Sequence, residues 1–317
     1  HNKMNKKTIP LFLIALAFSC LSCQEKESIY VSPPLGNVTF KEGFWSRYTS
    51  QNAKVTVPYC VERCAESGCL HNFQLAAGQI NGDYLSDNTW LDSDMYKALE
   101  AAFYSLMKYP DERLLQKTDS IVDTIISAQE KDGYLYTART THASHPRVVK
   151  FMGKERWTNM GHFSHELYNM GHMIEAAVAH YRATGKRNLL DVAIKNADLV
   201  CEVFGPNEGQ KHVPSGHPIA EMALAKLYKV TGDEKYLKMA KYFVEETGRG
   251  TDGHRLSEYS QDHKPILQQD EIVGHAVRAG YLYSGVADVA SLTQDTAYFN
   301  ALSRIWENMA SKKLFIT

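Results

Sequence analysis

A short linker that joins two apolar, helix-periodic stretches recurs along the chain, and it constrains the fold more than any other feature. Its four copies span residues 109–115, 184–190, 231–237 and 293–299. Gly185 and Gly232 suit the left-handed residue that closes a helix, and Asp233 and Asp295 suit the cap of the helix that follows. Each linker therefore predicts a helical hairpin.

Apolar residues recur at helical spacing from Met95 onward, which predicts an almost wholly helical chain. A hairpin cannot bury its apolar stripe alone, so successive hairpins must pack on one another. Closed helical toroids and open solenoids are the two solutions. Ahead of the hairpins, residues 24–44 predict a linker and a short β-like lead-in, in which Pro33, Pro34 and Gly36 act as breakers.

Residues 1–23 have the pattern of a bacterial lipoprotein signal peptide. Lys6 and Lys7 precede an apolar stretch that is too short to anchor the chain across a bilayer. Small residues then precede Cys23, as in a lipobox, which predicts lipidation there; an ordinary signal peptide is the alternative. We expect an exported protein, a periplasmic or outer-membrane/cell-surface lipoprotein that touches the membrane only through the lipid on Cys23.

Composition excludes some partners. The chain is 44% hydrophobic and 22% charged with a net charge of −1, which is typical of a globular protein and offers no basic field for nucleic acid. Cys60, Cys64 and Cys69 lie close together and Cys201 is alone, but no CxxC pair or paired histidines accompany them. Buried thiols or a disulfide are favoured over a zinc site.

Polar residues of unusual type fall just before the first helix of each predicted hairpin. They include Asp92 and Asp94, His165, His217 and His275. Because equivalent ends of stacked hairpins lie on the same side, we expect these residues to converge on one mouth. Carboxylates, imidazoles and aromatic rings together suit a carbohydrate. The two aspartates suit helix N-capping equally well.

The helix that follows His165 adds two residues to this predicted mouth. Tyr168 and His172 share its helix face. The spacing is not HExxH, which disfavours zinc-protease chemistry. Glu221, four residues after His217, suits either an orienting partner for that imidazole or a surface carboxylate beside a helix-start cap.

From about Phe40 to Thr317 the chain resembles glycoside hydrolase family 127, the β-L-arabinofuranosidase-like proteins formerly grouped as a domain of unknown function. Five stretches carry the resemblance: 92–100, 129–135, 165–181, 217–228 and 274–279. The resemblance implies an (α/α)6 toroid, incomplete at the C-terminus, over residues 45–317. It also implies that His165, His217 and His275 line the substrate site, with His172 in the same motif.

The activity implied is that of a retaining, exo-acting β-L-arabinofuranosidase of plant glycan breakdown, with an oligosaccharide or glycoside as substrate. Glycosidic cleavage generally uses an acid together with a nucleophile or base, and no such pair is visible in the sequence. In the family, a cysteine thiolate held on zinc by a Cys3Glu cluster is the nucleophile, and the resemblance places those residues beyond Thr317. We therefore expect neither a catalytic residue nor a metal ligand in the chain, and no activity from it alone.

Two readings from other classes compete with this one. A non-catalytic, glycan-binding helical lipoprotein predicts aromatic residues on the outside and no converging histidines. A lyase or epimerase on the same toroid needs a base near an arginine that binds a uronate, and Arg278 is the candidate.

Overall fold

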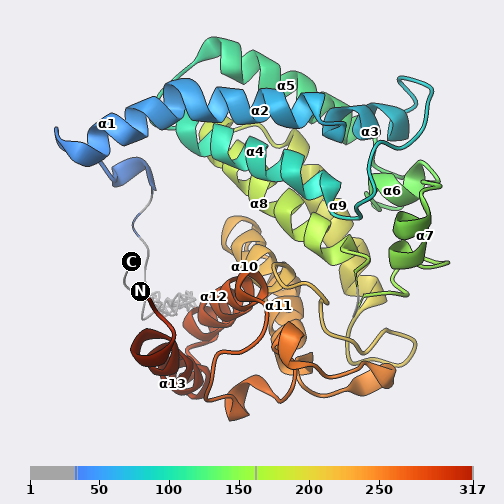
Figure 1. Ribbon diagram of the computed structural model, residues 1–317, viewed down its shortest axis with the longest axis vertical. Helices are drawn as coiled ribbons and strands as arrows, with labels where there is room; N and C mark the ends of the chain where they lie inside the picture. Colours follow the sequence, from blue (N-terminus) through green and yellow to red (C-terminus); the bar gives the residue numbers. More distant parts are fainter. Residues whose placement is uncertain (1–32, 34, 161–162, 316–317) are drawn as a thin grey trace, which may run out of the picture.

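The computed structural model describes residues 33, 35–160 and 163–315 (Figure 1). The predicted signal segment 1–23 and the predicted lipid site at Cys23 lie outside the described residues. Within the described part, none of the helices is both long and apolar enough to cross a membrane.

Four helical hairpins follow the linkers recognised in the sequence. They pair α4 (Leu91–Leu106) with α5 (Glu112–Ser127), α8 (Glu166–Thr184) with α9 (Asn188–Val203), α10 (Ala220–Thr231) with α11 (Glu234–Glu246), and α12 (Ala276–Thr293) with α13 (Thr296–Lys312). Gly185 and Gly232 close α8 and α10 with φ angles of 72° and 73°. The side chains of Asp233 and Asp295 each cap the next helix by accepting a backbone N–H. The predicted linker chemistry is confirmed.

The first helix of each hairpin belongs to an inner row. Helix α4 packs on α8, α8 on α10 and α10 on α12, while α5, α9, α11 and α13 lie outside them. Glycine permits the closest approaches: a Cβ added at Gly285 of α12 would lie 2.7 Å from the Cβ of Glu221 on α10. The described helices form an arc in Figure 1 that runs from α2 through α4 and α8 to α12. This is the predicted all-α toroid of hairpins.

Helices also precede the first hairpin, where the sequence pattern did not predict them. They are α1 (Phe44–Gln51), the π-helical segment η2 (Asn52–Thr56), α2 (Val57–Glu66) and α3 (Cys69–Ala76). Because α1, η2 and α2 follow one another without a break, they make one long helix. Val57 and Val61 are buried, and α2 packs on α4.

The β-like lead-in is wrong for the part that the structure describes. Residues 35–44 hold the short 3-10 helix η1 (Leu35–Asn37) and the beginning of α1, and the described residues contain no β-strand. A strand needs a neighbouring strand to pair its backbone groups. In this segment a side chain pairs with the backbone instead, because Nζ of Lys108 donates a hydrogen bond to the Gly36 carbonyl.

Three long connections link the hairpins and lie together at the right and lower right of Figure 1. They span residues 128–165, 204–219 and 247–275. They carry the short helices α6 (Thr137–Thr140), α7 (Pro146–Met152), η3 (Thr251–Gly253), η4 (Glu258–Ser260) and η5 (Ile266–Gln268). The beginnings of α8, α10 and α12 are therefore at this end of the arc.

Candidate functional site

Three histidines lie where the long connections meet the inner helices. His165 is the N-cap of α8, His275 is the N-cap of α12, and His217 lies just before α10. His165 has a φ of 59°, a left-handed conformation that costs energy for a residue with a side chain. Strain of this kind is found mainly where function needs a side chain in one position.

The rings of these histidines form one connected group with two residues of α8. The His217 ring centroid lies 5.7 Å from that of His165 and 6.1 Å from that of His275. The Tyr168 ring lies 4.3 Å from His217 and 4.6 Å from His172. We call these five residues the histidine cluster. The structure thus brings together five of the seven side chains expected to bind substrate.

Tyr281 also contacts the histidine cluster, although the sequence pattern did not predict it. Its ring centroid lies 5.4 Å from that of His172 and 6.2 Å from that of His217. Tyr281 is on α12 within two turns of His275, as His172 is on α8 after His165. Comparing equivalent positions of the two inner helices would have identified it.

Two further aromatic side chains border the histidine cluster. The Trp90 ring lies 5.0 Å from His165, and the Tyr259 ring lies 5.3 Å from His275. Tyr259 is 48% exposed, so it contributes an aromatic ring that solvent can reach. The guanidinium carbon of Arg278 lies 5.3 Å from the centre of the same ring.

The carboxylates of the two aspartates predicted to bind substrate contact other groups of the protein. Asp92 is 2% exposed and accepts hydrogen bonds from the N–H (2.8 Å) and the hydroxyl of Thr137. Burial raises its pKa to about 6, although the bonds from Thr137 oppose this. Asp94 pairs with Lys97 at 3.4 Å, and the Lys97 ammonium in turn lies 4.9 Å from the centre of the Tyr168 ring. Asp92 therefore links α4 to the first connection by hydrogen bonds. Asp94 pairs with Lys97, which in turn lies over the Tyr168 ring of the histidine cluster.

Glu221 does not orient His217, so that interpretation is wrong. Its carboxylate accepts from the Ser215 hydroxyl at 2.6 Å and from the Ile219 N–H at 3.2 Å. Burial raises its pKa. The physical reason is that α10 begins only at Ala220, so His217 and Glu221 are not one helical turn apart.

The imidazoles of His165, His172 and His217 are neutral at pH 7. Burial lowers the pKa of His165 to about 4, that of His217 to about 3 and that of His172 to about 2. The nearby positive charge of Arg278 lowers the pKa of His217 further. Each ring therefore offers one donor and one acceptor nitrogen rather than a charge.

The hydrogen-bond partners assign the tautomers of the three mouth histidines. Nδ1 of His165 lies 2.7 Å from the Phe163 carbonyl, and Nδ1 of His217 lies 3.0 Å from the Pro218 carbonyl. Because a carbonyl only accepts, both Nδ1 atoms carry the proton and both Nε2 atoms are acceptors. Nδ1 of His275 accepts the N–H of Arg278 at 3.4 Å, so its Nε2 is a donor.

His172 has hydrogen-bonding capacity that its surroundings leave unused. It is 3% exposed, and neither ring nitrogen has a partner among the described residues. Buried polar groups are nearly always paired, so an unpaired imidazole facing Tyr168 and Tyr281 is suited to a ligand.

The cysteines of the described part do not fit the zinc centre that the resemblance implies for the family. No three or more His, Cys, Asp or Glu side chains of the described residues are grouped so that they could hold a metal ion. Cys64 and Cys69 each donate to a backbone carbonyl at 3.6 Å, which is the behaviour of structural thiols. Cys60 is exposed and Cys201 half-buried, and all four thiols are free.

An arc of helical hairpins with imidazoles and aromatic rings gathered at one mouth offers the hydrogen-bonding groups and ring faces that suit a carbohydrate. The chain belongs to glycoside hydrolase family 127, because residues 37–317 match the family model described as beta-L-arabinofuranosidase, GH127 catalytic domain.

Relatives of this chain resemble it in sequence and, where their structures are known, in fold. The chain is 34% identical, over 323 residues, to a non-reducing end β-L-arabinofuranosidase of Bifidobacterium longum subsp. longum, covering 89% of this chain and 47% of that protein. It is 48% identical to a GH127 β-arabinofuranosidase of known structure, with a TM-score of 0.83 and coverage of 89% and 44%. A GH127 β-L-arabinofuranosidase from Geobacillus stearothermophilus T6 is 36% identical, with a TM-score of 0.80 and coverage of 89% and 46%. The chain spans about half the length of these relatives.

Proposed function

We propose that this chain forms the sugar-binding part of the catalytic barrel of a retaining, exo-acting β-L-arabinofuranosidase of plant glycan breakdown. The observation that carries the proposal is the histidine cluster, to which three hairpins contribute. The name of the relative that is 34% identical supplies the lead sugar, L-arabinofuranose at a non-reducing end. An oligosaccharide or glycoside that ends in this sugar is the proposed substrate.

Each histidine has a proposed role in holding the terminal sugar. Nε2 of His165 and of His217 accepts hydroxyl protons, and Nε2–H of His275 donates to a sugar oxygen. His172, whose nitrogens are both unpaired among the described residues, receives the part of the sugar that enters farthest. The rings of Tyr168 and Tyr281 supply apolar surface for its carbon atoms.

Bond cleavage is assigned to groups outside the described residues. Glu166 and Glu221 are the carboxylates next to the histidine cluster in sequence, and hydrogen bonds within the fold occupy both. The resemblance to the family implies that a zinc-bound thiolate would supply the nucleophile in a longer protein, and we propose that this chain alone binds the sugar without cleaving it. No residue described here takes part in that step.

A glycan-binding lipoprotein without catalysis is the second candidate. One observation favours it, since Phe44, Trp45 and Tyr48 of α1 are large aromatic residues exposed to solvent. The convergence of the histidines favours the glycosidase.

Export and lipidation at Cys23 remain part of both proposals. Mass spectrometry of the wild-type protein and of Cys23→Ser, expressed in a bacterium, tests them: a lipid on the wild type alone is the expected result.

The decisive experiment measures both binding and cleavage. L-Arabinose release from an aryl β-L-arabinofuranoside is followed for this chain and for a family-length version, each with and without a zinc chelator. We expect release only from the longer, zinc-containing protein, together with binding of methyl β-L-arabinofuranoside by both. Release by this chain alone would show that residues within 1–317 do the chemistry. Unchanged binding by His217→Ala would remove the histidine cluster from the site.

A further inference from the structure

A second group of side chains adjoins the histidine cluster at His165. The ring centroid of Trp90 lies 5.0 Å from that of His165, and the ring centroid of Phe163 lies 6.3 Å from it. Phe151 of α7 lies 5.0 Å from Phe163, ring to ring. The guanidinium carbon of Arg147, also on α7, lies 5.9 Å from the centre of the Trp90 ring and 5.5 Å from that of Phe151. We call Trp90, Arg147, Phe151 and Phe163 the aromatic rim.

His165 joins the aromatic rim to the histidine cluster. Its ring contacts His217 of the cluster at 5.7 Å, as well as Trp90 and Phe163 of the rim. The two groups therefore share a residue, and Phe163 lies one ring contact beyond the imidazole that faces His217. A ligand that extends from the cluster past His165 meets the aromatic rim next.

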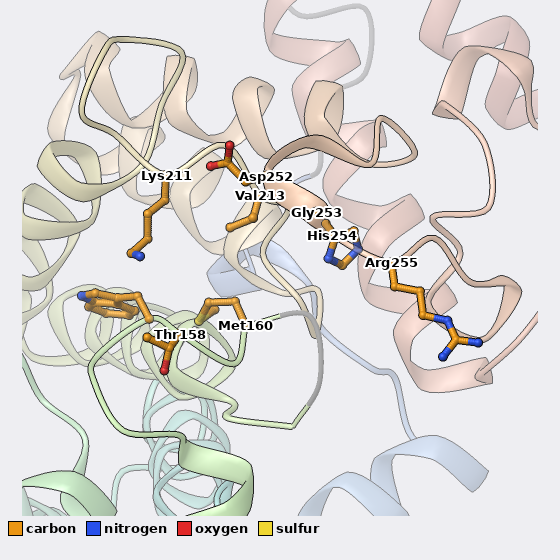
Figure 2. A pocket seen from close by; sticks show the side chains of 9 residues that line it. Thr158, Met160, Lys211, Val213, Asp252, Gly253, His254 and Arg255 are labelled. Atoms are coloured by element: carbon orange, nitrogen blue, oxygen red, sulfur yellow. The ribbon is translucent and has the colours of Figure 1, made fainter.

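The cavity drawn in Figure 2, of about 310 Å³, does not have this connection. Residues of the three connections line it, but none of them belongs to the histidine cluster. Gly216 lies between Val213 of its wall and His217 of the cluster, and it packs tightly on Met160. A Cβ added at Gly216 would lie 1.9 Å from the Met160 carbonyl oxygen. Backbone thus separates that cavity from the histidine cluster.

The position of Phe163 is set by its backbone rather than by burial of its ring. Its carbonyl accepts a hydrogen bond from the Thr89 hydroxyl at 2.5 Å and lies 2.7 Å from Nδ1 of His165. Phe163 is nevertheless 38% exposed, so part of its apolar surface is open to a ligand. A group that is held in place before binding loses less conformational entropy when a ligand arrives.

A pair of opposite charges lies beside these rings. Nη1 of Arg147 donates to Oδ2 of Asp87 at 2.9 Å, and the two side chains are 46% and 50% exposed. A guanidinium has five N–H donors and a carboxylate accepts several hydrogen bonds, so the pair keeps capacity for a ligand. Because the two charges balance, a phosphate or another strong anion is disfavoured. Hydroxyl-binding groups beside an open aromatic ring suit a neutral sugar.

We propose that the aromatic rim binds the sugar unit next to the terminal one. The inference rests on the proposed function, because it takes the histidine cluster as the site of the terminal sugar. Phe163 contacts the carbon atoms of the second unit, Arg147 donates to its hydroxyl groups and Asp87 accepts from them. The cluster then selects the terminal sugar, and the rim selects the unit to which that sugar is linked.

The test compares two probes on the complete 317-residue chain: methyl β-L-arabinofuranoside, and a disaccharide with a non-reducing β-L-arabinofuranosyl unit. Calorimetry gives their affinities, and saturation-transfer NMR reports which ring of the disaccharide touches the protein. The variants are Phe163→Ala, which removes the exposed ring, and Arg147→Met, which keeps an apolar stem between the aromatic rings and removes the charge.

Each variant has a matched control. Phe40→Ala removes another exposed phenylalanine ring. Arg187→Met removes the arginine of a second exposed ion pair, which Arg187 forms with Asp191 at the same distance of 2.9 Å. Circular dichroism checks that each variant is folded.

We expect the wild type to prefer the disaccharide, with saturation transferred to both of its rings. Phe163→Ala should reduce the preference about fivefold, as exposure of one apolar contact predicts. Arg147→Met should reduce it about tenfold, as loss of a charge-assisted hydrogen bond predicts. The two controls should keep the wild-type preference. Equal affinity of the wild type for the two probes, failure of the disaccharide to bind, or a wild-type preference in both rim variants would overturn the inference.

Binding of the methyl glycoside separates this inference from the proposed function. His217→Ala should weaken both probes by the same factor, whereas the two rim variants should change the preference and leave the affinity for the methyl glycoside near that of the wild type. Unchanged binding of both probes by His217→Ala would overturn the proposed function. Equal losses for both probes in Phe163→Ala and Arg147→Met would show that the rim only supports His165, and would overturn the second sugar site.

Discussion

The rings of Tyr168 and His217 lie 4.3 Å apart, centroid to centroid, although Tyr168 is in the first turn of α8 and His217 precedes α10. Tyr168 also contacts His172 and His165, so its ring joins the histidines of two hairpins. The Lys97 ammonium of a third hairpin lies 4.9 Å from the centre of the same ring. Three hairpins therefore contact one another at the mouth through the ring of Tyr168.

Truncation of Tyr168 should weaken sugar binding. We expect Tyr168→Ala to lower the affinity for methyl β-L-arabinofuranoside about thirtyfold, because the Tyr168 ring holds His217 and His172 in place through two ring contacts of roughly 1 kcal/mol each. Tyr168→Phe keeps the ring and should retain most of the affinity. Calorimetry measures both, with Tyr59→Ala, a solvent-exposed tyrosine on α2, as the control. Wild-type affinity in Tyr168→Ala would contradict the site.

The buried histidines should make the fold sensitive to acid. Burial lowers the pKa of His217 to about 3, whereas an unfolded histidine titrates near 6.5, so below that pH the unfolded state binds the proton first. The contribution of His217 is complete above about pH 6.5 and is lost as the pH falls toward its folded pKa, by about 1 kcal/mol per pH unit.

The comparison with His217→Asn isolates this contribution. Asp92 and Glu100, whose pKa values burial raises to about 6 and about 7, act in the opposite direction but are present in both proteins. Urea unfolding at pH 7.5, 6.0 and 5.0 should show the wild type losing stability relative to the variant. Parallel pH profiles would mean that His217 is not held neutral.

Thr137 should be needed to keep Asp92 buried. Thr137→Val removes the hydroxyl that donates to Oδ1, and an unsatisfied buried carboxylate costs about 2 kcal/mol or more. Thr141→Val is a matched control, because the Thr141 hydroxyl donates only to the Thr137 carbonyl of its own helical turn. Denaturant unfolding compares the two. Equal losses would show that the Asp92 contact does not stabilise the fold.

Gly216 should not tolerate a side chain. Its φ is 79°, and an added Cβ would lie 1.9 Å from the Met160 carbonyl oxygen, so Gly216→Ala must displace backbone. Gly232→Ala has a similar φ of 73° but meets nothing within 4 Å, so it costs only the conformational strain of about 1 kcal/mol. We expect Gly216→Ala to lower the free energy of unfolding by at least twice as much. Similar values for the two variants would contradict the close packing beside the histidine cluster.

The buried ion pair of Glu175 and Lys226 should be sensitive to loss of its cation. The Glu175 side chain is 2% exposed and that of Lys226 is 22% exposed, and Lys226→Met leaves the carboxylate without its counter-ion, at a cost of about 3 kcal/mol. Lys229→Met removes the cation of a more exposed pair with Asp288 and should cost less than 1 kcal/mol.

A second substitution and a change of pH sharpen this prediction. Adding Glu175→Gln to Lys226→Met should recover much of the lost stability. The loss in Lys226→Met should be larger at pH 8 than at pH 6, because without the lysine the folded-state pKa of the carboxyl rises further and its protonated form is favoured at lower pH. A loss in Lys226→Met that matches that in Lys229→Met would show that burial does not matter here.

The hairpins could be predicted from the sequence because the information is local. Gly185, Gly232, Asp233 and Asp295 close and cap helices through their own backbone conformation or a neighbouring N–H. The lead-in could not be predicted in this way, because a strand exists only where a second strand pairs with it. The helices before Met95 escaped prediction because α1 buries no side chain and α2 buries only Val57 and Val61.

The convergence of the histidines could be predicted, because equivalent hairpin ends lie on the same side. The hydrogen-bond partners of individual residues could not. Asp92 bonds to Thr137, and Asn169 accepts the N–H of Ser93, across sequence separations that no local pattern encodes. The prediction that Glu221 could orient His217 was wrong because α10 begins at Ala220, after His217. Tyr281 could have been found by comparing equivalent positions of α8 and α12, and its ring contacts with His172 and His217 identify it.

The placement of three of the cluster's histidines on or beside the connections has a consequence for how such a barrel diversifies. The helices are held by caps and apolar faces, while the groups that would meet a glycan come mainly from residues 128–165, 204–219 and 247–275 or from the first turns after them. Connections tolerate substitution and insertion better than packed helices do. New sugar preferences can therefore arise in these three connections while the scaffold that supports them is left intact.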